Sequence, residues 1–302
     1  MRHFLNIADW SAPEMEALLK QAVYLKLEWQ NGGNRPVLSG KLLAMIFQKP
    51  SLRTRVSFQV AMKHLGGDAI YLSSDEIGLG KRESIPDVAR VLSGYVQGIV
   101  ARVFSHDHLT QLAAAASVPI INGLSDSSHP CQAFADMLTL YEHFGTLRGL
   151  TIAYVGDSNN VVFSLGEAAA RYGVALRVAS PRGYQLSEAA IAHLRGMGLA
   201  LSLTDDPRAA VEGVDCIYTD TWTSMGQEAE AEVRRRVFPP YQVNADLVRL
   251  AAKHVVVMHC LPAHRGEEIT DEVADGAHSL IFQQAANRLH AQKAILARLL
   301  GS

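Results

Sequence analysis

Short apolar runs alternate with amphipathic stretches from residue 41 onward. Runs of this length predict buried strands, and apolar residues spaced three and four apart predict helices. The expected strands are residues 41–47, 68–74, 98–104 and 118–123, and the expected helices are 54–66, 83–95 and 108–116. Because strands and helices alternate, we expect a mostly parallel sheet with helices on both faces.

A second series of the same kind follows a predicted helix at 130–144, which ends at Gly145. Its expected strands are residues 151–157, 175–180, 216–222, 254–260 and 279–284, and its helices run to residue 172 and over 188–197 and 245–253. We therefore predict an α/β fold with two domains, residues 1–146 and 147–285. Each is a mostly parallel, doubly wound sheet flanked by helices.

Two further helices flank these series, at residues 13–28 and 286–300. No strand follows the second, so we expect it to pack back on a domain. The basic run at 234–236 is expected to be a solvated surface, and the His-Asp-His at 106–108 to be a loop.

Composition excludes several classes of function. The 302 residues carry 28 Lys and Arg against 30 Asp and Glu, a net charge of −2, so no basic surplus favours nucleic acid. The three cysteines are widely spaced and form no disulfide framework or metal motif, which favours a reducing cytoplasm. We expect neither a signal peptide nor a membrane anchor, because no apolar stretch is long enough.

In parallel sheets, ligands bind beyond the carboxyl ends of the strands. After the first strand come Ser51, Arg53, Thr54 and Arg55 at the start of a helix, where backbone N–H groups favour an anion such as phosphate. The alternative is that Ser51 or Thr54 only caps the helix and the arginines are solvated. Arg102 favours the anion site, because an arginine in an apolar strand needs an anionic partner that all three arginines could share.

The corresponding turn of the second series, residues 156–160, lacks the glycines of a dinucleotide motif, so we expect no nucleotide cofactor. Asp157 and Asp220 at neighbouring strand ends suit an amino-acid ligand. Asn159 and Asn160 offer amide groups, although turn formation also explains such a pair. No metal-ligand spacing surrounds His129 or His259, so we expect no bound metal. No nucleophile motif is present either, so we expect direct group transfer without a covalent enzyme intermediate.

Six ordered segments resemble the aspartate/ornithine carbamoyltransferase family. They are PSLRTR at 50–55, HPCQ at 129–132, DSNNV at 157–161, DTWTSMG at 220–226, HCLP at 259–262 and NRLHAQKA at 287–294. The resemblance implies a carbamoyl-phosphate domain at 1–146, to which the last helix, 286–302, returns, and an acceptor domain at 147–285. It also implies no cofactor, and homotrimers or multiples of trimers.

Carried over by position, the resemblance assigns the contacts with carbamoyl phosphate. Ser51, Arg53, Thr54 and the backbone of Leu52 would hold the phosphate. Arg102, His129 and Thr54 would face the carbonyl oxygen, and Gln132 the carbamoyl amide. The remaining members of this pocket are Pro130, Cys131, Cys260, Leu261 and Arg288. Of these, Arg102, His129, Cys260 and Arg288 are the expected catalytic residues.

The SMG and HCLP segments resemble ornithine enzymes rather than aspartate enzymes. Asn160, Asp220, Ser224 and Met225 would hold the α-amino and α-carboxylate groups of ornithine, with Cys260 beside its side-chain amine. The implied reaction is carbamoyl transfer from carbamoyl phosphate to that amine. The alternatives are another acceptor (putrescine, an acylated ornithine or aspartate) or a non-catalytic amino-acid-binding homologue.

Two positions depart from the family's pattern. Leu52 replaces a threonine, and Gly78 stands where many members have a glutamine near the carbamoyl group. A backbone N–H serves equally well at the first position, whereas the second removes a possible contact with carbamoyl phosphate.

Overall fold

The computed structural model describes residues 1–224 and 226–301, which form two compact units. Unit 1 comprises residues 1–138 and the chain from residue 286 onward, and unit 2 comprises residues 139–285. The chain passes from one unit to the other inside α6 (Pro130–Phe144) and inside α13 (Ile281–Leu300). The division at residue 138 lies eight residues before the predicted boundary at 146.

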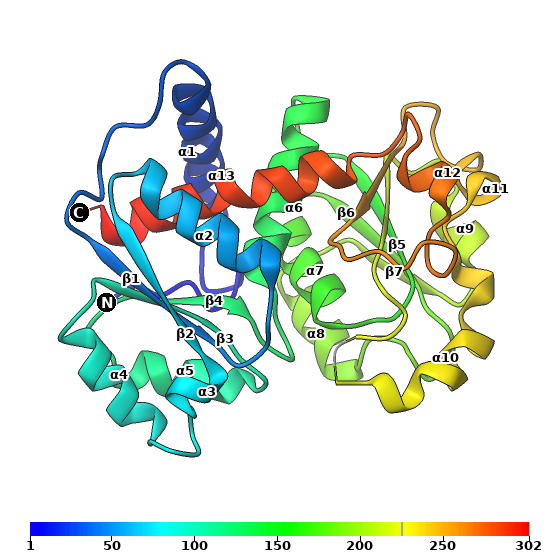
Figure 1. The fold of residues 1–302 in the computed structure, drawn as a ribbon. Coiled ribbons are helices and arrows are strands. Elements are labelled where there is room, and N and C mark those ends of the chain that lie inside the picture. Colours follow the sequence, from blue (N-terminus) through cyan, green and yellow to red (C-terminus); the bar gives the residue numbers. More distant parts are fainter. Residues whose placement is uncertain (225, 302) are drawn as a thin grey trace. The chain divides into compact units, whose positions relative to one another are not determined.

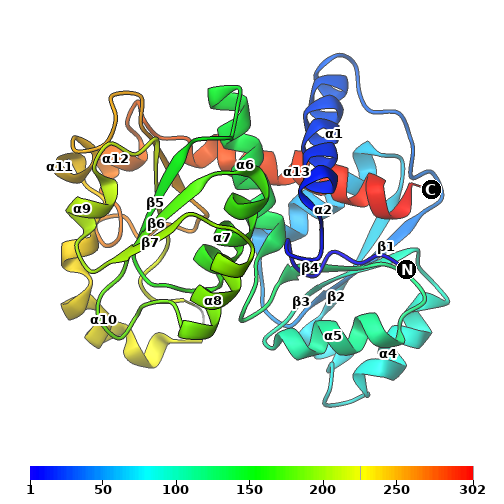
Figure 2. The ribbon, with the colours of Figure 1, turned by 180° about the vertical axis from the view of Figure 1, so that it is seen from behind.

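Unit 1 is built on a four-stranded parallel sheet in the order β2-β1-β3-β4. Its strands are β1 (Leu42–Phe47), β2 (Asp68–Ser73), β3 (Gly98–Arg102) and β4 (Ile120–Leu124). Its helices are α1 (Ala12–Gln30), α2 (Leu52–His64), α3 (Ser74–Ile77), α4 (Ile85–Ser93), α5 (His106–Ala115) and most of α13. Helices α4 and α5 cover one face of the sheet, and α1, α2 and α13 lie on the other (Figures 1 and 2).

Unit 2 is built on a five-stranded parallel sheet in the order β7-β6-β5-β8-β9. Its strands are β5 (Thr151–Val155), β6 (Ala175–Ala179), β7 (Leu201–Thr204), β8 (Cys216–Thr219) and β9 (Val256–His259). Its helices are α7 (Asn160–Tyr172), α8 (Glu188–Gly196), α9 (Pro207–Val211), α10 (Ala231–Val237), α11 (Ala245–Val248) and α12 (Asp271–Ala274), with 3₁₀ turns at Glu228–Glu230 and Pro239–Tyr241.

The strand order of both sheets creates a switch point where ligands are expected. In unit 1 the chain runs from β1 outward to β2 and then returns to β3 on the other side, so the switch point lies between β1 and β3. In unit 2 it lies between β5 and β8 for the same reason. Helices α2 and α7 begin directly after β1 and β5, which places their N-termini at these two points.

Local sequence explains where these two helices begin. Ser51 caps α2, and its hydroxyl accepts a hydrogen bond from the N–H of Thr54. Asn159 caps α7 in the same way, accepting from the N–H of Val161, and α7 ends at Gly173 in the left-handed conformation that favours glycine. The caps therefore fix the first turns that face the switch points.

Three sequence-based expectations were wrong. Residues 279–284 are not a strand, because α13 begins at Ile281 and continues its amphipathic pattern unbroken. His106 is not in a loop but is the first residue of α5, which Ser105 caps. Strand β7 was not predicted, because it is an edge strand with a part-exposed pattern that lacks the apolar run of the buried strands.

Apart from these differences, the predicted α/β class and the two parallel sheets are confirmed. Within residues 1–224 and 226–301, none of the helices combines the length and the apolar character that crossing a membrane requires.

Candidate functional site

The N-terminus of α2 in unit 1 carries two hydroxyl groups beside free backbone N–H groups. The Ser51 hydroxyl accepts from the N–H of Thr54 at 3.3 Å and donates to the Thr54 hydroxyl oxygen at 3.1 Å. Capping and anion binding are therefore compatible here, because the cap leaves the other N–H groups of the first turn facing outward. The positive end of the 13-residue helix adds to the attraction for an anion.

A buried chain of polar contacts joins Thr54 to α13 and α6. Arg288 is 3% exposed and donates through its Nη1 to Oε1 of Gln132 at 2.7 Å and through Nη2 to the Thr54 hydroxyl at 3.3 Å. The Nε2 of Gln132 then donates to a carboxylate oxygen of Asp136 at 2.8 Å. These contacts fix the orientation of the Gln132 amide.

The charges of three guanidinium groups act on a single buried imidazole. Burial lowers the pKa of His129 well below its ordinary value, and the nearby charges of Arg288, Arg102 and Arg53 lower it further. The ring is therefore neutral at pH 7 and can donate one N–H without adding a charge. Arg288, Arg102 and Arg53 therefore concentrate positive charge near this ring, which suits a doubly charged phosphate group.

Arg55 is the third arginine that was expected in the shared anion site, but it has a different environment. Arg55 is exposed, and its guanidinium stacks over the ring of Tyr71 at 3.9 Å from the centroid. The expectation that Arg55 shares one anion with Arg53 and Arg102 was wrong. Arg288, brought in by α13, joins those two arginines instead.

Residues 129–131 follow β4 and lead into α6. Pro130 and Cys131 are both buried in the first turn of α6. The thiol of Cys131 donates to the carbonyl oxygen of Asn122 at 3.3 Å, and burial raises its pKa to about 12. This cysteine is therefore a packing residue that supports the turn, not a reactive thiol.

In unit 2, Asp220 lies at the carboxyl end of β8 and is held by three donors. Its Oδ1 accepts from the N–H of Thr221 at 2.8 Å and from the thiol of Cys260 at 3.0 Å. Its Oδ2 accepts from the side-chain amide of Asn159 at 2.7 Å. Three hydrogen bonds thus fix the orientation of this side chain at the switch point, where it can bind a cationic group.

Arg234 was expected at a solvated surface, and that expectation was wrong. It is 4% exposed and forms an ion pair with Asp157 at 2.8 Å. It also donates to the carbonyl oxygen of Trp222 at 2.7 Å and pairs with Glu230 at 2.9 Å. The charge of Asp157 is therefore largely balanced within the protein, which leaves Asp220 as the carboxylate available to a ligand.

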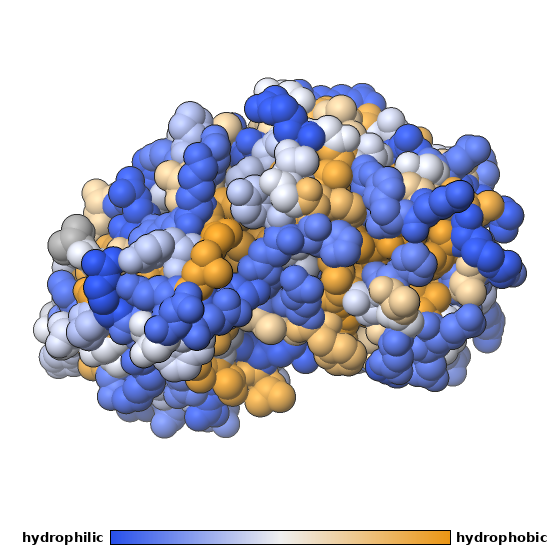
Figure 3. Space-filling model, turned by 90° about the horizontal axis from the view of Figure 1, so that it is seen from above, coloured by the Kyte–Doolittle hydropathy of each residue, from blue (hydrophilic) through white to orange (hydrophobic). Residues whose placement is uncertain are grey.

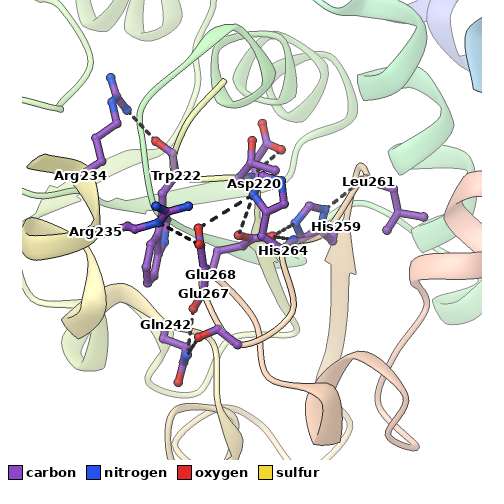
Figure 4. Close-up of polar contacts among 12 residues, drawn as sticks. Asp220, Trp222, Arg234, Arg235, Gln242, His259, Leu261, His264, Glu267 and Glu268 are labelled. Atoms are coloured by element: carbon purple, nitrogen blue, oxygen red, sulfur yellow. Dashed lines mark hydrogen bonds and ion pairs between the residues drawn. The ribbon is translucent and has the colours of Figure 1, made fainter. Parts of the chain in front are cut away.

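The imidazole of His259 is fully buried and uses both ring nitrogens (Figure 4). Its Nε2 contacts a carboxylate oxygen of Glu268 at 3.0 Å, and its Nδ1 accepts from the N–H of Leu261 at 2.8 Å. This bond holds Leu261 at a φ of 59°, a conformation that residues other than glycine rarely adopt. Glu268 therefore orients the imidazole of His259, and the imidazole in turn fixes the backbone that follows β9, next to Cys260.

Two groups of side chains in the described part of the chain have donor types that metals bind. In the first, Asp220, His259 and Cys260, the hydrogen bonds just described already engage the ligand atoms. In the second, His264, Glu267 and Glu268, other contacts engage the carboxylates: Glu268 contacts His259 and accepts from the backbone N–H of His264, and Glu267 pairs with Arg235. Neither group therefore favours a metal over the contacts that it already makes.

The structure gives a position or a contact for only some of the other residues that were predicted to bind the acceptor substrate. Asn160 is the first residue of α7, and the N–H of Ser224 donates to the side chain of Gln227 at 3.2 Å. Met225 lies outside the described residues. Sequence reasoning missed Asn159 as the partner of Asp220, and also Glu268, whose link to His259 no motif indicates.

Comparison with known proteins agrees with this geometry. The family model described as aspartate/ornithine carbamoyltransferase, carbamoyl-P binding domain, matches residues 2–142. The model for the Asp/Orn binding domain matches residues 148–299. The chain belongs to the aspartate/ornithine carbamoyltransferase family. The resemblance inferred from the six motifs is confirmed.

Individual members of the aspartate/ornithine carbamoyltransferase family are similar over nearly the whole chain. An ornithine carbamoyltransferase of Anoxybacillus flavithermus is 53% identical over 303 residues, which cover 99% of this chain and 96% of that protein. The solved structure of the Pyrococcus furiosus enzyme is 51% identical, with a TM-score of 0.96, and the match covers 100% of this chain and 97% of that one. That of Thermus thermophilus is 45% identical, with a TM-score of 0.90 and 98% of each chain covered.

Proposed function

We propose that this protein transfers the carbamoyl group of carbamoyl phosphate to the side-chain amine of L-ornithine, giving L-citrulline and phosphate. The observation that carries the proposal is the gathering of three guanidinium groups around the neutral His129, which suits carbamoyl phosphate. The fixed carboxylate of Asp220 suits the α-amino group of an amino acid. The names of the similar proteins specify ornithine.

Most of the residues that bind carbamoyl phosphate in this proposal belong to unit 1. Ser51, Arg53 and Thr54, with the backbone of Leu52, hold the phosphate at the N-terminus of α2. Arg102 and His129 donate to the carbonyl oxygen, and Gln132 contacts the carbamoyl amide. The remaining contacts are Arg288, Pro130, Cys131 and the backbone of Cys260 and Leu261. The buried chain from Thr54 through Arg288 to Gln132 supports these roles, because it orients both polar groups.

Ornithine is bound through its α-amino and α-carboxylate groups. Asp220 takes the ammonium, and Asn160, Ser224 and Met225 complete the pocket. Asp220 serves as an anchor and not as the base, because a carboxylate next to the reacting amine would stabilise its unreactive ammonium form. In this proposal Cys260 lies nearest the side-chain amine, and its thiol donates to Oδ1 of Asp220, so that this oxygen is already occupied and does not bind the reacting amine.

The reaction requires that amine to be neutral. Removing the proton of a lysine-like ammonium at pH 7 costs about 4.6 kcal/mol, which partial desolvation and nearby positive charge reduce. The amine then attacks the carbonyl carbon, and negative charge develops on the carbonyl oxygen. Arg102, His129 and Thr54 stabilise that charge, as an oxyanion hole does. The C–O bond to phosphate breaks, and the departing phosphate accepts the proton of the amine.

The assembly is proposed to be a homotrimer or a multiple of trimers in the cytoplasm. Unit 1 exposes large apolar side chains, among them Leu52 at 75% and Val56 at 45% on α2, which a second copy of the chain could cover. Hydrophobic side chains also reach the surface in patches on the face drawn in Figure 3. The three cysteines are free thiols, which fits a reducing compartment. A relative from Pyrococcus furiosus is named anabolic, which supports a role in arginine biosynthesis.

One experiment tests the reaction. The protein is incubated with carbamoyl phosphate and, in separate samples, ornithine, putrescine, acetylornithine or aspartate, and the carbamoylated product and phosphate are measured. We expect citrulline alone, and another carbamoylated product would identify a different acceptor. No carbamoylated product, and no phosphate release above that of a protein-free control, would match a non-catalytic homologue.

The arginines of the phosphate pocket give a second test. Arg53→Ala and Arg102→Ala each remove a charge-assisted contact to the developing anion, so citrulline formation should fall by about 100-fold or more. Arg55→Ala is the matched control, because Arg55 belongs to the same motif but stacks on Tyr71. Activity near that of the wild type in either of the first two variants would contradict the assigned pocket.

A further inference from the structure

The side chain of Gln48, three residues before Ser51, joins three segments of unit 1. Its Oε1 accepts from the backbone N–H of Phe104 at 3.0 Å and from Nδ1 of His108 at 3.2 Å. Its Nε2 donates to the carbonyl oxygen of Leu79 at 3.3 Å. Its backbone N–H donates to the carbonyl oxygen of Arg102 at 2.8 Å. One residue therefore ties the end of β1 to the end of β3, to α5 and to the turn at Leu79.

These bonds lie where the regular sheet stops. The pairing of β1 with β3 ends at Phe47 and Arg102, one residue before Gln48. On its other side, β3 changes register against β4 between Ala101 and Arg102. Backbone hydrogen bonds continue past this point, from the N–H of Gln48 to the carbonyl oxygen of Arg102 and from the N–H of Val103 to that of Leu124, but outside the regular pairing of the strands. The side-chain amide of Gln48 adds the next bond on the β1 side, because its Oε1 accepts from the backbone N–H of Phe104.

Gln48 is also close in sequence to the residues that bind the phosphate. It stands three residues before Ser51 and directly after the last residue of β1. A second contact acts in the same direction, because the ammonium group of Lys49 lies 4.7 Å from the centre of the Phe104 ring. The separation between the loop at 51–54 and the guanidinium of Arg102 thus depends on what residue 48 binds.

We propose that Gln48 is a positioning residue for carbamoyl phosphate. Its amide sets the register between the phosphate loop and Arg102, so that both reach one substrate. The inference rests on the proposed function, in which these two elements bind the same molecule. An amide is suited to the task because it accepts from the Phe104 and His108 groups and donates to Leu79 at the same time.

Two substitutions separate the two halves of the amide. Gln48→Met keeps the length of the side chain but removes both the acceptor and the donor. Gln48→Glu keeps the acceptor for Phe104 and His108 and replaces the donor to Leu79 with an oxygen. We expect Gln48→Met to raise the KM for carbamoyl phosphate by about tenfold, since a displaced charge contact weakens binding on this scale, with an intermediate rise for Gln48→Glu. The KM for ornithine should stay within about twofold of the wild type.

Gln97 provides a matched control at the opposite end of the same two strands. Its Oε1 accepts from the backbone N–H of Leu42 at 2.8 Å, at the amino end of β1. Gln97→Met therefore removes a comparable side-chain bond between β1 and the chain before β3, far along the strands from the phosphate loop. We expect it to lower the melting temperature by about as much as Gln48→Met does, but to leave both KM values unchanged.

The proposal is wrong if Gln48→Met and Gln97→Met give the same KM for carbamoyl phosphate, or if Gln48→Met lowers only kcat. Competitive inhibition by inorganic phosphate provides an independent reading and should weaken in parallel with carbamoyl phosphate binding. If Gln48→Met does not fold, Gln48→Glu carries the same comparison. If the KM for carbamoyl phosphate is unchanged in Gln48→Met while the wild type forms citrulline, only the role of Gln48 is overturned. A wild-type protein that forms no citrulline overturns the proposed function instead.

Discussion

Replacing Arg234 with methionine should weaken unit 2 and the use of ornithine together. Methionine has a similar length but no charge, so it removes the ion pair with Asp157 and the hydrogen bond to the carbonyl oxygen of Trp222. That carbonyl stands two residues before Ser224, in the segment proposed to bind ornithine. The variant therefore leaves the buried carboxylate of Asp157 without its counter-charge. It also removes the hydrogen bond that holds Trp222, at one end of the segment proposed to bind ornithine.

The size of the effect follows from the burial of the two partners. The side chains of Arg234 and Asp157 are 4% and 8% exposed, and removing one partner of such a pair costs about 3–5 kcal/mol. The second pair, with Glu230, adds little, because that side chain is 56% exposed and solvent screens it. We therefore expect a loss of about 3–5 kcal/mol in the free energy of unfolding of unit 2.

The effect should depend on pH. Burial raises the pKa of Asp157, and Arg234 partly offsets the rise. Without the arginine the pKa rises further, so the charged carboxylate destabilises the fold at neutral pH, and protonation relieves this as pH falls through the raised pKa. The stability gap between wild type and Arg234→Met should thus be largest near pH 7.5 and shrink towards pH 5.5.

Urea unfolding at these two pH values measures the gap, and steady-state kinetics measures the KM for ornithine. The double variant Arg234→Met with Asp157→Asn is the control, because it removes the uncompensated charge and should recover most of the lost stability. A loss below about 1 kcal/mol with an unchanged KM for ornithine would refute the reasoning.

Three further outcomes are expected. Burial lowers the pKa of Lys293 to about 8, so the stability of Lys293→Met relative to the wild type should be highest below pH 8 and fall as pH rises from 8 to 10.5, which urea unfolding can measure. A thiol reagent at pH 8 should label Cys260 and spare the buried Cys131, whose pKa is about 12, as peptide mapping can check. Cys260→Ser should raise the KM for ornithine more than that for carbamoyl phosphate, and unchanged kinetics would count against its proposed place.

Much of the fold follows from local pattern. Buried parallel strands are short continuous apolar runs, so β1, β3 and β5 are visible in the sequence, whereas the edge strand β7 is not. Caps are also local, and Ser51 and Asn159 begin their helices within three residues of their partners. Both switch points can therefore be located from the ends of the predicted strands, without any knowledge of how distant segments meet.

Partners far apart in the chain could not be predicted in this way. Arg234 looks like one member of a solvated basic run, yet the carboxylate that holds it is 77 residues away. Arg288 reaches Gln132 across 156 residues, and only the family's motif indicated its role. Gln48 belongs to no motif, because its side chain binds backbone groups, which carry no sequence signal.

The split of unit 1 along the chain affects how the enzyme is made. A ribosome that adds about 5–20 residues per second needs roughly 7–30 s for the 147 residues of unit 2, which come before the return to unit 1 at residue 286. During that time Thr54 and Gln132 have been synthesised, but Arg288, which binds both, has not. The phosphate pocket can therefore form only after unit 2 has been translated. A chain released from the ribosome before Arg288 would not consume carbamoyl phosphate.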